Sequence, residues 1–217
     1  MPDFDFNIEF NYRINTPFSE DSRLPKPTTP SDWNNSAYTH YKTNLKKDHL
    51  RKQKGRCAYC RKQIEIDGYY EDLDHVIAKT IKPEWMIKPK NLVVACNACN
   101  RLKRKDATLR SGYVGLSFPS DSNDFIVFNP HFDQWSDHFG IEDDLFLVAK
   151  PNSKGKETIK ICRLWRYHIP LNYAREKRLL AHPDTKKKLT QRLNLTTKGS
   201  QDYNSINQSI IYLIENS

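Results

Sequence analysis

Apolar and polar positions alternate in patterns that predict the elements of this chain. Residues 4–12, FDFNIEFNY, alternate with a period of two and predict a strand. Residues 16–33 contain four prolines and predict a connector without regular structure. From residue 35 to residue 54 the apolar positions recur at helical spacing, so we expect a helix that stops at Gly55.

Shorter elements are expected further along the chain. Residues 62–79 alternate again and predict a hairpin with Asp67-Gly68 as its turn. The apolar run NLVVAC, residues 91–96, predicts a strand, and residues 97–110 predict a helix that ends before Gly112. The later predicted elements are strands within residues 124–151, a basic helix within residues 156–180 and an amphipathic stretch over residues 202–217.

These elements predict a protein of the α+β class with four segments. The segments are an N-terminal strand and Pro-rich connector (1–34), a core with the basic helix (35–112), a C-terminal α/β extension (113–180) and a helical tail (181–217).

The charge of the chain favours a polyanionic partner. The 35 Lys and Arg residues exceed the 26 Asp and Glu residues, which gives a formal charge of +9. Basic residues concentrate within residues 42–62, where Asp48 is the lone acid, and within residues 101–105. These clusters indicate either a nucleic-acid surface or two solvated helix faces.

Neither a membrane span nor a signal peptide is expected. No apolar run approaches the ~18 residues that span a bilayer, and the N-terminus MPDFDFNIEF is acidic and aromatic. We therefore expect a cytoplasmic protein without a membrane partner.

Four of the five cysteines form two C-x-x-C pairs. The pairs are Cys57 with Cys60 and Cys96 with Cys99, and 35 residues separate them. Two thiolates from each of two tight turns suit a tetrahedral Zn²⁺ ion. Disulfides are disfavoured in the cytosol, and a redox pair would need a thioredoxin-like context that is lacking here. Cys162 stands alone and is expected to be a small core residue.

Any catalytic group must lie outside such a site, because a zinc ion with four thiolate ligands has no open position. Asp74 and His75 are adjacent in the segment between the cysteine pairs, and Lys79 follows. Asn91 precedes the second predicted strand, and Asn100 directly follows Cys99.

These residues resemble the HNH, or ββα-metal, nucleases. The similar branch carries a four-cysteine zinc, as in the phage Holliday-junction resolvase endonuclease VII, and shares its core with the HNH domain of Cas9. The resemblance covers residues 50–110 and implies a ββα-metal core. The matching residues are Cys57, Cys60, Asp74, His75, Asn91, Cys96, Cys99 and Asn100.

The resemblance implies roles that agree with the chemistry of phosphodiester hydrolysis. A neutral imidazole can deprotonate water, so His75 is the expected general base. Asp74 and Asn100 offer hard oxygen ligands for Mg²⁺ or Mn²⁺, and Asn100, where many members have histidine, favours a single magnesium ion. Asn91 is expected to tie the loop between the strands and to orient His75.

Basic residues near these positions are candidates for contact with DNA or RNA. Lys79 and Arg101 are alternatives for the contact with the reacting phosphate. The expected nucleic-acid contacts are Lys79, Arg101, Lys103, Arg104, Lys52 and Arg56. The alternative function is a non-catalytic zinc module that binds nucleic acid or scaffolds a complex.

The later part of the chain resembles a narrower group of HNH proteins. Nuclease subunits of Septu and related retron systems of bacterial anti-phage defence carry similar residues after the core. This resemblance implies a protein partner such as a defence-system ATPase, while restriction-associated and mobile-element HNH nucleases stay open alternatives. The matching positions are Asn129, Pro130, His138, Phe139, Thr158, Ile159 and Arg175.

Overall fold

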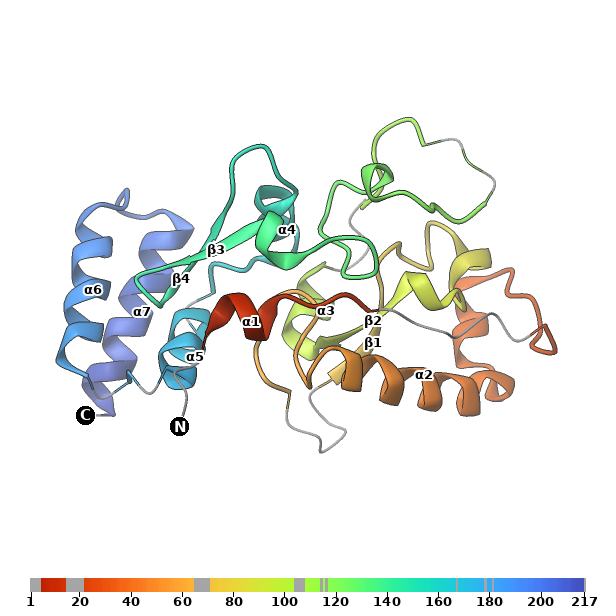
Figure 1. Ribbon diagram of the computed structural model, residues 1–217, viewed down its shortest axis with the longest axis horizontal. Helices are drawn as coiled ribbons and strands as arrows, with labels where there is room; N and C mark the ends of the chain where they lie inside the picture. The colour runs from red at the N-terminus through yellow and green to blue at the C-terminus, as the bar shows by residue number, and fades with distance from the viewer. Residues whose placement is uncertain are drawn as a thin grey trace.

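A computed structural model gives the fold. It describes residues 5–14, 22–64, 71–103, 108–113, 115, 117–166, 168–177, 179–180 and 182–216. Small sheets and helices combine in a mixed α+β arrangement, with α2 toward one end of the molecule and α6 and α7 at the other (Figure 1). None of the described helices has the length and apolar character that crossing a bilayer requires.

The described elements are short. The helices are α1 (Phe6–Phe10), α2 (Thr39–Lys52), α3 (Asn97–Lys103), α4 (Gly155–Cys162), α5 (His168–Glu176), α6 (Pro183–Asn194) and α7 (Gln201–Glu215). The strands are β1 (Glu71–His75), β2 (Leu92–Cys96), β3 (Phe139–Glu142) and β4 (Phe146–Ala149). The 3₁₀ turns are η1 (Pro30–Asn34), η2 (Ser36–Tyr38), η3 (Pro83–Trp85), η4 (Pro89–Asn91), η5 (Ser122–Asp124) and η6 (Trp135–Asp137).

The central unit is a two-stranded antiparallel sheet followed directly by a helix. β1 pairs with β2 in a register that runs from Glu71 opposite Cys96 to His75 opposite Leu92. Every residue of β2 is buried, and α2 packs against it. Because α3 begins at Asn97, the residue after β2, it lies close to both strands (Figure 1).

The predicted basic helix is confirmed as α2, and its end leads the chain into the first cysteine pair. Lys54 and Gly55 both have positive φ, 53° and 69°, and reverse the chain direction. A side chain at Gly55 would approach the Gln63 amide to 2.7 Å, so glycine suits this position. The fully buried Gln53 amide donates to the carbonyls of Arg56 and Val94 and accepts from the Val94 N–H, which fixes this turn on β2.

The strand predicted over residues 4–12 is wrong, because the structure has helix α1 there. Phe6 and Phe10 lie one turn apart and both contact the Tyr173 ring, at centroid distances of 5.4 and 5.6 Å. Phe10 also meets the edge of Trp135 at 5.2 Å. Tertiary packing of this aromatic pair therefore outweighs the period-two pattern.

Two further predictions on the central unit have different outcomes. The second strand is confirmed as β2. The helix predicted over residues 97–110 ends at Lys103, and at Leu109 the chain is extended and bridges to Phe125. The hairpin turn predicted at Asp67-Gly68 lies outside the described residues.

The C-terminal half is more helical than its pattern predicts. Residues 124–151 contain the β3–β4 hairpin, but the basic helix expected within residues 156–180 is divided into α4 and α5 at Arg163, which has a left-handed φ of 47°. The amphipathic stretch forms α7, whose Ile206 packs with Leu189 of α6, the other helix of the predicted helical tail. Cys162 is buried, as expected.

A buried carboxylate, Asp133, organises the loop that precedes the β3–β4 hairpin. It accepts hydrogen bonds from the backbone N–H of Asn129 at 2.8 Å and from the Ser122 hydroxyl, and it pairs with Lys154 at 2.9 Å. His138 lies 3.7 Å away. Burial alone would raise the pKa of Asp133, but these partners outweigh it and lower the pKa to about 2.

Replacing Asp133 with asparagine is expected to destabilise the protein by about 2 kcal/mol at neutral pH. Because the pKa of the folded state lies below the ordinary value of 3.8, this contribution is complete above pH ~4 and is lost as the pH falls toward 2. Urea unfolding of the wild type and the variant between pH 7 and pH 3 measures it. A difference in stability that stays constant across this range would contradict the assignment.

Candidate functional site

The four paired cysteines converge on one point. Cys57 and Cys60 lie in the turn after α2, Cys96 ends β2, and Cys99 lies in the first turn of α3. Their sulfur atoms all lie within 4.8 Å of one another, and all four residues are buried. Four converging thiols are donors that a tetrahedral metal ion prefers. This cluster, named here the four-cysteine site, could therefore hold a metal ion such as zinc.

Two residues from the C-terminal half contact the four-cysteine site. Arg166 donates from Nη2 to the Cys99 sulfur at 3.1 Å, and the Tyr173 hydroxyl donates to the Cys60 carbonyl at 3.0 Å. Burial alone would lower the pKa of Arg166, but the negative charge of Cys99 raises it. The Arg166 guanidinium would thus offset part of the negative charge that the cysteines carry when they hold a metal ion. The spacing of the cysteines gives no signal for either contact.

Asp74 faces the interior, between the four-cysteine site and α3. Tyr59 donates its hydroxyl to Asp74 Oδ2 at 2.5 Å, and Lys103 Nζ lies 3.4 Å from Oδ1. Asp74 and Lys103 are only 4% and 1% exposed. Burial raises the pKa of Asp74, although Lys103 and Tyr59 both stabilise its charged form.

His75 is held against the loop that joins the two strands. Its Nε2 lies 3.1 Å from the Met86 carbonyl oxygen, and Trp33 packs edge-on against the imidazole with ring centroids 4.4 Å apart. Because a carbonyl can only accept, Nε2 carries the proton and Nδ1 keeps the lone pair. Burial, together with the charges of Lys79 and Lys103, lowers the pKa of His75 to about 3, so the ring is neutral at physiological pH.

Asn91 ties the two ends of the same loop together. Its side chain is fully buried, accepts from the Ile77 N–H at 2.7 Å and donates to the carbonyls of Ile77 and Trp85 at 3.1 and 3.0 Å. Ile77 lies two residues after His75, and Trp85 directly precedes Met86. The amide thus fixes the backbone on both sides of the imidazole.

Asn100 lies on α3 and meets β1 through Asp72. Its amide donates to Asp72 Oδ2 at 3.0 Å, while Asn97 Nδ2 lies 3.4 Å from the same oxygen. Asn100 and Asp72 line an open hollow of about 330 Å³, which Trp33 and Lys42 also line. The two metal ligands predicted from the sequence thus have different partners: Asn100 bonds to Asp72, whereas Asp74 contacts Tyr59 and Lys103.

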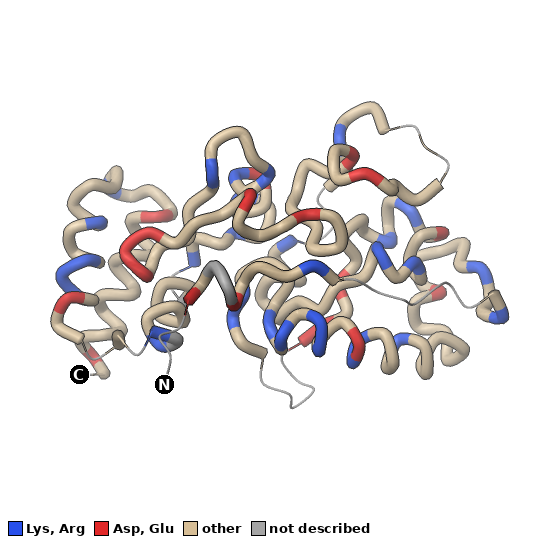
Figure 2. Tube along the Cα trace, viewed as in Figure 1, with Lys and Arg blue, Asp and Glu red and all other residues tan. Residues whose placement is uncertain are grey.

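The basic residues proposed from the sequence have different environments. Lys79 is half-buried near Trp33, and Arg101 is exposed on α3. Lys52 is paired with Asp48 at 2.7 Å. Lys103 and Arg56 lie inside the fold and do not present their charges to solvent, and Arg104 lies outside the described residues. Figure 2 shows that Lys and Arg are frequent along the second half of α2.

Sequence reasoning did not single out three residues that contact the predicted ones. Tyr59 and Asp72 could have been predicted from the sequence, because Tyr59 lies between Cys57 and Cys60, and Asp72 shares a strand face with Asp74. Trp33 had no such signal, because the Pro-rich segment that carries it has no spacing relation to His75.

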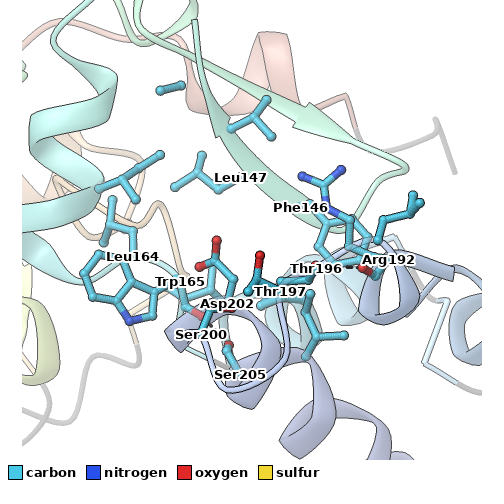
Figure 3. A pocket seen from close by; sticks show the side chains of 17 residues that line it. Phe146, Leu147, Leu164, Trp165, Arg192, Thr196, Thr197, Ser200, Asp202 and Ser205 are labelled. Carbon is cyan, nitrogen blue, oxygen red and sulfur yellow. Dashed lines mark hydrogen bonds between the residues drawn. The ribbon is translucent and has the colours of Figure 1, made fainter. Parts of the chain in front are cut away.

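A second hollow, of about 590 Å³, lies in the C-terminal half. It is bounded by β4, by the start of α5 and by the loop that joins α6 to α7. Figure 3 shows the Asp202 side chain directed across this hollow toward Leu147. Of the site residues predicted from the sequence, none that the structure describes lines it.

Comparisons with known proteins find one partial similarity. No protein-family model matches the chain. Among curated proteins, the Septu protein PtuB of Bacillus thuringiensis is 23% identical over 115 residues, which are 53% of this chain. The aligned region is 38% of that relative, so the chain matches well under half of its length. Over half its length, this protein is therefore a distant relative of a Septu protein.

Proposed function

We propose that this protein is a metal-dependent endonuclease of the HNH type that hydrolyses phosphodiester bonds of nucleic acid, with DNA as the expected substrate. One observation carries the proposal. β1, β2 and α3 form a ββα succession beside the four-cysteine site, and Asp74, His75 and Asn100 come from its adjoining elements.

His75 is the proposed general base. The Met86 carbonyl holds Nε2–H, which leaves Nδ1 free to accept a proton from the attacking water. Burial is the largest cause of the low pKa of His75, and the positive charges of Lys79, Lys103 and Lys42 lower it further. A substrate phosphate near these lysines would offset their share of the shift.

Two metal ions with different roles belong to this proposal. Zinc suits the four buried thiols and has a structural role there. Mg²⁺ or Mn²⁺ suits the oxygens of Asp74 and Asn100, and Asp72 adds a carboxylate 3.0 Å from the Asn100 amide. When bound, this second ion supplies positive charge to the phosphate and to the leaving 3′ oxygen. The expected products carry 5′-phosphate and 3′-hydroxyl ends.

The similarity to the Septu protein PtuB supports a role in anti-phage defence. In such a role the nuclease acts with a protein partner, for which an ATPase subunit is the candidate that the sequence resemblance implies. The net charge of +9 is consistent with a nucleic-acid substrate.

One observation favours a second candidate, a non-catalytic zinc module that binds nucleic acid or scaffolds a defence complex. Both oxygens of Asp74 have partners inside the protein, Tyr59 and Lys103. In this alternative, Asp74 is a structural residue and His75 performs no chemistry.

A cleavage assay separates the two candidates. Purified wild type and His75→Ala are incubated with plasmid DNA and with RNA, in Mg²⁺ or Mn²⁺, with and without the ATPase partner. We expect the wild type to cut and the variant to be slower by roughly 10²- to 10⁴-fold, the usual contribution of a general base. Asn97→Ala is the control. Asn97 contacts Asp72, as Asn100 does, but has no proposed role in the reaction, so this variant is expected to cut like the wild type. Equal cleavage by wild type and His75→Ala would rule out His75 as the base.

A further inference from the structure

Three side chains from separate segments meet on one side of His75. Trp33 comes from η1, Lys42 from α2, and Lys79 from the turn after β1. The ammonium groups of Lys42 and Lys79 lie 4.8 and 6.0 Å from the centre of the Trp33 ring. Lys42 also donates to the Trp33 carbonyl at 2.8 Å, which joins α2 to the Pro-rich connector.

Lys42 and Lys79 differ from Lys46 in their ion pairing. Among the described residues, no acidic side chain forms an ion pair with Lys42 or Lys79, whereas Lys46 pairs with Glu71 at 3.0 Å. Burial lowers the pKa of both lysines, and the charge of Lys42 lowers that of Lys79 further. Two neighbouring cations without an acid favour an anion between them, and phosphate has the right charge.

The indole of Trp33 borders an open hollow that Asn100 also lines. It is half-buried and lines the 330 Å³ hollow together with Lys42 and Thr43. Asp72 and Asn100 line the same hollow. Trp33, which packs against His75, therefore shares this hollow with Asn100, a proposed metal ligand.

An aromatic ring beside lysines has the chemistry that binds single strands. Unpaired bases stack on aromatic side chains, and basic residues follow the phosphates. In an intact duplex each base is already stacked and paired, so a lone tryptophan in a hollow offers a duplex no equivalent contact. The combination of Trp33 with Lys42 and Lys79 thus favours an unpaired strand.

We propose that Trp33, Lys42 and Lys79 bind one unpaired nucleotide of the substrate next to the scissile phosphate, so that the preferred substrate is single-stranded or locally unpaired nucleic acid. Trp33 stacks on the base, and the lysines contact its phosphates. This inference deepens the proposed nuclease function and rests on it.

Binding measured without Mg²⁺ or Mn²⁺ tests the site independently of cleavage. Fluorescence anisotropy gives the affinity of the full-length protein for a labelled single-stranded oligonucleotide and for the matching duplex. We expect Trp33→Ala to weaken single-strand binding roughly tenfold to hundredfold, the range that loss of a stacking ring produces. Trp33→Phe keeps a ring and is expected to retain most of the affinity, and duplex binding is expected to change little.

The salt dependence of binding tests the two lysines, with a third lysine as the control. Lys42→Ala and Lys79→Ala are each expected to reduce the salt dependence of single-strand binding by about 0.7 in the log–log slope, the value for one lost phosphate contact. Lys156→Ala, which removes an exposed charge from α4, is expected to leave the slope unchanged. Thermal melting identifies any variant that has lost its fold.

Three results would overturn the inference: unchanged single-strand binding by Trp33→Ala, an equal loss for single strand and duplex, or Trp33→Phe behaving like Trp33→Ala. The proposed nuclease function fails by a different result. Binding that depends on Trp33, combined with no cleavage that depends on His75, would reject the nuclease and keep the single-strand site.

Discussion

Replacing Cys60 with alanine is expected to abolish metal binding and to unfold the protein at room temperature. Structural zinc contributes about 10–16 kcal/mol in small zinc domains, whereas a whole domain is stable by only about 5–15 kcal/mol. The four cysteines come from the turn after α2, from β2 and from α3, so a lost site releases all three elements. Metal analysis and circular dichroism measure the two effects.

Cys162→Ala is the matched control for this experiment. Cys162 is equally buried but lies outside the four-cysteine site, so its replacement removes only a sulfur atom from the core. We expect this variant to keep its metal and to lose no more than about 1 kcal/mol. A Cys60→Ala protein with the metal content and melting temperature of the wild type would contradict a metal-binding role of the cluster.

Replacing Lys103 with methionine is expected to destabilise the protein by about 3–5 kcal/mol, because it leaves the buried charge of Asp74 without its cation. Lys103 is 1% exposed, lies 3.4 Å from Asp74 and donates to the His75 carbonyl at 2.7 Å. Methionine fills a similar volume, so the loss reports on charge and hydrogen bonding. Urea unfolding gives the free-energy difference.

The double variant Asp74→Asn/Lys103→Met is expected to recover most of that loss. Its buried amide carries no charge and can still accept from Tyr59. If the double variant were as unstable as Lys103→Met alone, the cost would come from packing or from the lost bond to the His75 carbonyl, and the ion pair would contribute nothing.

The elements predicted correctly are those in which local pattern and tertiary packing agree. α2 has helical periodicity and a glycine stop, and β2 is a short apolar run buried on both sides. Residues 6–10 were misassigned because Phe6 and Phe10, four residues apart, fit a strand and a helix equally well. Contacts with residues distant in the sequence, such as Tyr173, more than 160 residues away, select the helix.

The candidate site also has a part that the sequence predicts and a part that it does not. The spacing of the two C-x-x-C pairs was enough to predict a metal site, and the structure brings the four thiols together. The contacts of Trp33 with His75 and of Arg166 with Cys99 were not predictable, because each joins segments without a spacing rule. The roles proposed for Asp74, His75 and Asn100 stay predictions for the cleavage assay.

The bonds from Arg166 and Tyr173 to the cysteine turns would link the stability of the C-terminal half to a metal ion held by the four-cysteine site. Arg166 bonds directly to the Cys99 sulfur, and Tyr173 of α5 bonds to the backbone of Cys60. Release of such an ion would remove an ionic partner from Arg166 and loosen the turn on which Tyr173 rests. We expect amide hydrogen exchange in α5 to accelerate when such an ion is removed, because α5 and the cysteine turns would then unfold together as one cooperative unit.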